Sequence, residues 1–175
     1  EYKSTRLLID PWLYGSTYWR SWWNYPKVKE NLLEKIKPTH IYITHLHWDH
    51  FHGPSLQSLF KKDVQILIPK VHTRRFVDDL EYLGFKNIKE LDHGVIQKLS
   101  DDFYIRSFQG GIGVDSAMVI NDSKTTILNA NDCKLFGLPL KQITDIYPKI
   151  DFTLRSHSSA SAIPYCIKQY ENENS

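Results

Sequence analysis

The sequence predicts an α/β domain in which two β-sheets pack together and helices cover their outer surfaces. Short apolar strands alternate with amphipathic helices in the first half of the chain. A run of closely spaced strands fills the middle, with a turn at "NDSK" between two of them. The length of 175 residues and the hydrophobic content of 41% fit a single domain, spanning residues 1–175, with its own core.

The first half alternates between strands and helices. Residues 7–9 predict a buried strand that Asp10-Pro11 ends. Residues 24–37 predict a helix, because Pro26 suits a first helical position and apolar residues recur on one face. The β-branched and aromatic residues of "THIYITH" predict the next strand. The elements expected after it are a helix at 53–62, a strand at 64–69 and a helix at 70–84.

The second half predicts short strands, one helix and a last strand. The middle strands are expected at 85–91, 95–99, 103–108, 116–120 and 125–130. The helix is expected at 138–148 and the last strand at 150–157.

Four of the eight histidines lie in "THLHWDHFHG", directly after a predicted strand. Strand alternation would direct His45 and His47 to the same side, where both could bind one metal ion. Asp49 and His50 follow in a turn that can aim them at a second ion. Imidazoles and carboxylates together suit zinc, and also iron or manganese. A structural zinc finger is disfavoured because no cysteine pair lies nearby.

The pattern His-x-His-x-Asp-His resembles the signature of the metallo-β-lactamase superfamily. The apolar strand before it and the short helix after it match the family, as does "LLIDPWL", an early strand ending in an aspartate. This resemblance implies an αββα sandwich, a metallo-β-lactamase-like α/β fold with the metal site at its edge. The family's opening strand is largely absent, so we expect a trimmed N-terminus.

The resemblance also implies a set of metal ligands. It places His45 and His47 at a first metal, and Asp49, His50 and His157 at a second, with Asp132 bridging the two. Two such cations lower the pKa of a bound water to near 7. Asp49 is then expected to act in catalysis by orienting that water or holding its proton.

One ligand of the family is missing. The first metal normally has a third histidine, but residues 107–120 contain none. Gln109 and Asp115 are the candidates to replace it. An aspartate there would favour iron or manganese over zinc. One or two divalent ions are expected, with zinc placed first. A single tightly held metal and an inactive relative are the alternatives.

Three stretches, "IDPWLYGSTYWRSWW", "VDSAMVINDSKTTILNANDC" and "LRSHSSASAIPYC", resemble the metallo-β-lactamase-like region of the cytidine-monophosphate N-acetylneuraminate hydroxylases and their bacterial relatives. Those hydroxylases also carry a Rieske domain, which needs two Cys-x-His pairs, and this sequence has none. The main expectation is therefore a metal-dependent hydrolase that uses a metal-activated water on an ester, amide or phosphodiester bond. The alternatives are an iron-dependent oxygenase of the hydroxylase type and a non-catalytic metal-binding domain.

The substrate is expected to be a small molecule or lipid-like. Residues 14–25 carry six aromatic side chains, interpreted first as packing and second as a pocket wall that stacks on a sugar, nucleobase or lipid. A formal charge of +2 gives no support for nucleic acid as a partner. Two cysteines make no disulfide framework, so a cytoplasmic location is expected, and no apolar run reaches the roughly 18 residues of a membrane span. The oligomeric state is left open.

Overall fold

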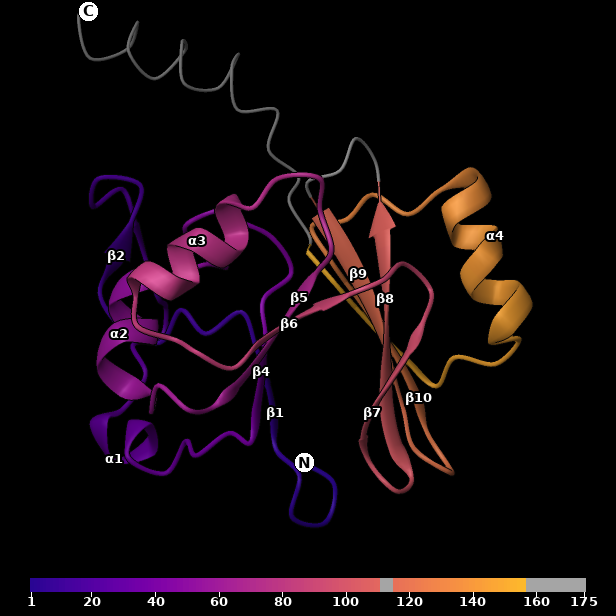
Figure 1. The fold of residues 1–175 in the computed structure, drawn as a ribbon, viewed down its shortest axis with the longest axis horizontal. Helices are drawn as coiled ribbons and strands as arrows, with labels where there is room; N and C mark the ends of the chain where they lie inside the picture. Colours follow the sequence, from indigo (N-terminus) through magenta and orange to yellow (C-terminus); the bar gives the residue numbers. More distant parts are fainter. Residues whose placement is uncertain (111–114, 157–175) are drawn as a thin grey trace, which may run out of the picture.

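The protein forms four layers, which follow one another from left to right in Figure 1: three helices, a four-stranded sheet, a five-stranded sheet and one helix. The structure, a computed structural model, describes residues 1–110 and 115–156. The αββα sandwich expected from the sequence is confirmed. A separate two-stranded hairpin, β2 (Ser16–Thr17) with β3 (Trp22–Trp23), follows the first strand.

The first sheet is parallel throughout. Its order is β1 (Leu7–Ile9), β4 (His40–Tyr42), β5 (Gln65–Pro69) and β6 (Ile88–Leu91). Its outer face carries α1 (Glu30–Leu33), α2 (Gly53–Leu59) and α3 (Arg75–Tyr82). Ile41, Ile66 and Ile68 point into this layer and pack against Phe76 and Leu80 of α3. Their burial fixes the orientation of β4, from which the histidine motif leaves the sheet.

The second sheet is mostly antiparallel. Its order is β11 (Phe152–Arg155), β10 (Thr126–Asn131), β9 (Asp115–Asn121), β8 (Phe103–Gly110) and β7 (Ile96–Ser100), and only β10 and β11 pair in parallel. Helix α4 (Gly137–Ile146) covers its outer face through Ile143, which packs on Phe108 and Val119.

A third apolar cluster joins the two sheets. Tyr42 and Leu67 of the first sheet meet Ile105 and Met118 of the second, and all four side chains are fully buried. Because the centre of the first sheet is covered on both faces, β4 and β5 are buried at consecutive positions rather than alternating. This cluster packs β4 against β9, which pairs with β10, and the polar residues of the candidate site lie near the ends of these strands.

Two sequence predictions about the N-terminal third are wrong in part. The helix expected at 24–37 is only Glu30–Leu33, and it buries no residue fully, so little packing free energy is available to extend it. The strand expected at 39–45 ends at Tyr42. The backbone N–H of Thr44 donates instead to Asp10 Oδ1, 2.8 Å away, so the histidine motif leaves the sheet earlier than expected.

Among the described residues, every helix is too short or too polar to cross a membrane.

Candidate metal centre

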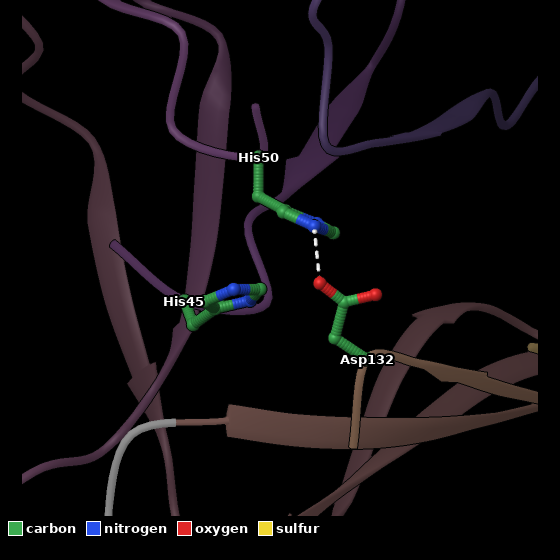
Figure 2. Close-up of side chains that lie close together, drawn as sticks. All are labelled: His45, His50 and Asp132. Atoms are coloured by element: carbon green, nitrogen blue, oxygen red, sulfur yellow. Dashed lines mark hydrogen bonds and ion pairs between the residues drawn. The ribbon is translucent and has the colours of Figure 1, made fainter. Parts of the chain in front are cut away.

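The histidine motif and two aspartates of the second sheet meet at one edge of the sandwich. Figure 2 shows His45 and His50, from the loop after β4, facing Asp132, which directly follows β10. The Nε2 atom of His50 lies 3.2 Å from Oδ2 of Asp132. Strand alternation does not set the directions of His45 and His47, because both lie beyond the end of β4. Their rings nevertheless contact each other, with centroids 4.5 Å apart.

Two groups of potential ligand atoms share His45. One group is His45, His50 and Asp132, and the other is His45, His47 and Asp115; within each, the ligand atoms lie within 4.8 Å of one another. His45 Nε2 is 2.7 Å from His47 Nδ1 and 3.7 Å from Asp115 Oδ1. Each group offers two imidazoles and one carboxylate, a donor set that suits zinc, iron or manganese.

Hydrogen bonds determine which nitrogen of His45 faces the other potential ligands, His47 and Asp115. The hydroxyl of Thr44 donates to Asp10 Oδ2 at 2.8 Å, so its oxygen is left to accept from Nδ1 of His45, 2.9 Å away. This arrangement places the proton of His45 on Nδ1. The lone pair of Nε2 is then directed toward His47 and Asp115, as metal coordination requires.

Asp10 orients His50 in the same way. Its Oδ2 accepts a hydrogen bond from His50 Nδ1 at 2.8 Å, which leaves Nε2 facing Asp132. A carboxylate that holds the far nitrogen of a ligating histidine is a common support of metal sites. The sequence identified Asp10 only as the aspartate that ends an early strand. Its left-handed φ of 45° turns its side chain back toward Thr44 and His50, which no sequence pattern indicated.

His45, which is buried, and His50, which is partly buried, differ in how easily they take up a proton. Burial lowers the pKa of His50. The hydrogen bond and negative charge of Asp10, with the charges of Asp49 and Asp132, have a larger effect and raise this pKa to about 9. Burial and the neighbouring His50 lower the pKa of His45. The carboxylates around His50 therefore make this edge favourable for a cation.

The residues fit a divalent cation. Oδ1 of Asp115 is buried and has no hydrogen-bond partner among the described residues. A buried carboxylate oxygen without a partner is costly, and a metal ion beside His45 and His47 would satisfy it. The donor atoms, the fixed tautomers and this oxygen all favour metal binding.

Gln109 and Asp115 were left open as replacements for the missing histidine, and the structure separates them. The amide of Gln109 donates to the carbonyl of Lys70, away from the cluster. Asp115 faces His45 at the start of β9. The geometry therefore favours Asp115.

The remaining expected ligands are Asp49, Asp132 and His157, and the structure describes the first two. Asp49 lies 3.4 Å from His50 Nε2 through Oδ2, and its Oδ1 accepts a hydrogen bond from the hydroxyl of Tyr18 at 2.8 Å. Asp132 groups with His45 and His50, so a bridging role stays a prediction. His157 lies outside the described residues.

No protein-family model matches the chain. A protein of Mycolicibacterium smegmatis named as a Rieske 2Fe-2S iron-sulfur protein is 30% identical over 174 residues, or 94% of this chain and 33% of that protein. Cytidine monophosphate-N-acetylneuraminic acid hydroxylase of Mus musculus is 30% identical over 134 residues, or 73% of this chain and 23% of the hydroxylase. The chain thus spans a third or less of these curated relatives.

Two solved structures are similar in fold. CmlA, a diiron beta-hydroxylase from Streptomyces venezuelae, has a TM-score of 0.63 and 20% identity, covering 87% of this chain and 31% of CmlA. Isothiocyanate hydrolase from Delia radicum gut bacteria has a TM-score of 0.65 and 20% identity, covering 85% of this chain and 63% of the hydrolase. At this identity the likeness establishes the fold, which a hydroxylase and a hydrolase share.

Proposed function

The chain has the metallo-β-lactamase-like fold that its histidine motif indicated, and we propose that it is a metal-dependent hydrolase of small molecules. One observation carries this proposal: three histidines of one loop form two groups of potential ligands that share His45, one with Asp132 and the other with Asp115. In hydrolysis the co-reactant is water, so this domain would need no other protein. The bond cleaved would be an ester, amide or phosphodiester.

Three histidines and two aspartates would hold the metal: His45, His47, His50, Asp115 and Asp132. A bound divalent ion supplies Lewis acidity, which makes a water molecule acidic near neutral pH. The chain's own part is to orient that water and take its proton. Asp49 is suited to this because its Oδ2 faces the cluster while its Oδ1 is held by Tyr18. Burial and the hydrogen bond to Asp49 raise the pKa of Tyr18 to about 12, so the tyrosine stays protonated and keeps donating.

A second candidate function is an iron-dependent hydroxylase. Two histidines with one carboxylate and open positions form the ligand set of non-haem iron oxygenases, and both clusters have this composition. The similarity to proteins named as hydroxylases and Rieske proteins also supports it. Electrons would have to come from elsewhere, because the sequence lacks the Cys-x-His pairs of a Rieske cluster.

Metal content and oxygen dependence separate the two functions. The chain is purified without added metal, analysed for its elements, and assayed on a panel of ester, amide and phosphodiester substrates with and without oxygen. Zinc with oxygen-independent cleavage would support the hydrolase, whereas iron with oxygen consumption would support the hydroxylase. Asp49→Asn should keep the metal and lose turnover. Failure to bind any metal after reconstitution would contradict both functions.

A further inference from the structure

A cleft of about 480 Å³ lies beside the metal centre. One wall is the turn of the β2–β3 hairpin, with Tyr18, Trp19 and Arg20, and the other is formed by Trp48 and residues 51–54. Trp48 lies between His47 and Asp49 in the chain, and successive Cα atoms are about 3.8 Å apart. Whatever contacts Trp48 in this cleft is therefore next to the metal-binding loop.

The cleft has an aromatic surface that is open to solvent. Trp19 is 85% exposed and Trp48 is 44% exposed. Their rings meet edge to face with centroids 4.9 Å apart, and Tyr18 stacks on Trp48 at 5.6 Å. Exposed aromatic faces held in a fixed arrangement are typical of binding sites for flat ligands. Packing within the protein, the first interpretation of this segment, does not account for indoles so largely in solvent.

The turn that presents these rings is held in an unfavourable conformation. Tyr18, Trp19 and Arg20 have φ values of 46°, 55° and 69°, a left-handed run that residues with a side chain rarely adopt. Hydrogen bonds hold the turn in place: Ser21 N–H donates to the Tyr18 carbonyl at 3.1 Å, and the Trp23 indole donates to the Arg20 carbonyl at 3.0 Å. Strain of this kind persists where the surroundings enforce it, and it is frequent at binding sites.

The cleft also carries polar groups suited to an anion. Arg20 lines it and forms no ion pair with the carboxylates of the described residues. Thr17, in the same wall, is 4% exposed, and its hydroxyl has no hydrogen-bond partner in the part of the chain that the structure describes. The ligand that these groups complement has a planar ring and a negative charge.

We propose that this cleft binds the planar, anionic part of the substrate, with the ring on Trp19 and Trp48 and the charge at Arg20. The rest of the substrate would then extend past Trp48 to the metal centre. That the ligand of this cleft is the substrate rests on the proposed function, but its binding to the cleft requires no metal. Tyr18 joins the two sites, because its ring stacks on Trp48 while its hydroxyl holds Asp49.

The test is a titration of the full chain, freed of metal with a chelator, with 2-naphthoate. The five indole N–H signals report binding in nitrogen–proton NMR spectra. We expect saturable shifts of the Trp19 and Trp48 signals. 2-Naphthylmethanol, which has the ring without the charge, should bind about threefold more weakly, and acetate should cause no saturable shift. Absence of saturable binding by 2-naphthoate would overturn the proposal.

Variants identify the contacts. Trp19→Ala should weaken 2-naphthoate about fivefold, the effect of one stacked ring, and Arg20→Gln about threefold while leaving 2-naphthylmethanol unaffected. Tyr82→Ala, an aromatic residue of α3 that is 92% exposed, is the matched control and should bind as the parent chain does. Equal affinity in the parent, Trp19→Ala and Arg20→Gln would overturn the assignment, provided that amide spectra show folded variants.

The outcomes separate this inference from the proposed function. Binding of 2-naphthoate by a chain that takes up no metal even after reconstitution would support the cleft and contradict the proposed enzyme. Metal-dependent turnover without 2-naphthoate binding would contradict the cleft alone.

Discussion

At the scale of single residues, Asp10 supports the metal centre by holding both Thr44 and His50. Its carboxylate accepts from Thr44 N–H, from the Thr44 hydroxyl and from His50 Nδ1. Asp10→Asn should lower metal affinity about 10- to 100-fold, because an amide no longer holds His50 with the same charge and geometry. Competition with a metal-chelating dye measures the affinity directly.

A matched control separates this effect from a general loss of negative charge. Asp92 is a surface aspartate that pairs with Lys70 at 2.9 Å, and Asp92→Asn should bind metal like the parent chain. Equal metal affinity in Asp10→Asn and Asp92→Asn would show that Asp10 does not support the centre.

A second prediction at this scale concerns the missing histidine. Asp115→Ala should remove one metal ion per chain or weaken its binding, because it takes a carboxylate from the His45–His47 cluster. Gln109→Ala should leave the metal content unchanged, since its amide is bonded to Lys70. Elemental analysis of both variants after identical dialysis decides the question, and the reverse pattern would mean that Gln109 is the ligand.

The motif spacing and strand ends predict His45, His47, His50 and Asp132 as ligands, and the structure places them in the two groups of potential ligand atoms. Sequence reasoning could not choose between Gln109 and Asp115, since that choice depends on whether Lys70 captures the amide. Nor could it find the support given by Asp10, which lies 40 residues from His50 in the chain. Contacts of this kind follow from sheet order rather than from local pattern.

At the scale of elements, most strands and helix α4 were predictable, whereas the first helix and the β2–β3 hairpin were not. β1, β5, β9 and β10 appear within a residue or two of their expected bounds, since apolar side chains on both faces leave few alternatives. The β2–β3 hairpin was missed because its strands are two residues each and its turn uses left-handed residues other than glycine. The aromatic cleft, which depends on this hairpin, was therefore expected only as one interpretation of residues 14–25.

A chain of buried hydroxyls ties β4 to β8 and β9 beneath the site. Ser116 donates to the carbonyl of Thr44 at 2.9 Å, so it accepts from the Tyr42 hydroxyl at 2.7 Å, and Tyr42 in turn accepts from Ser107 at 2.8 Å. Burial raises the pKa of Tyr42, which keeps this donor protonated. The hydroxyls of Tyr42, Ser107 and Ser116 therefore keep these hydrogen bonds only while the two sheets are packed together.

Tyr42→Phe should lower the free energy of unfolding by about 1–3 kcal/mol, because Ser107 and Ser116 lose a partner in a dry interior. Chemical denaturation measures the change. Tyr104→Phe, in β8 of the second sheet and only partly buried, should change stability by less than about 0.5 kcal/mol and serves as the control. A loss in Tyr104→Phe as large as in Tyr42→Phe would contradict the role of the buried chain.

For the whole molecule, the metal would act as a cross-link between the two halves of the sandwich. The histidines follow β4 of the first sheet, whereas Asp115 lies in β9 and Asp132 directly follows β10 of the second. A metal at 100 times its dissociation constant should therefore stabilise the fold by about 2.7 kcal/mol. For a domain of this size that raises Tm by about 5–10 °C, measurable by calorimetry with and without chelator. Asp132→Asn should reduce the rise while leaving the metal-free Tm nearly unchanged. An equal rise in the parent and in this variant would place the metal outside the junction of the two sheets.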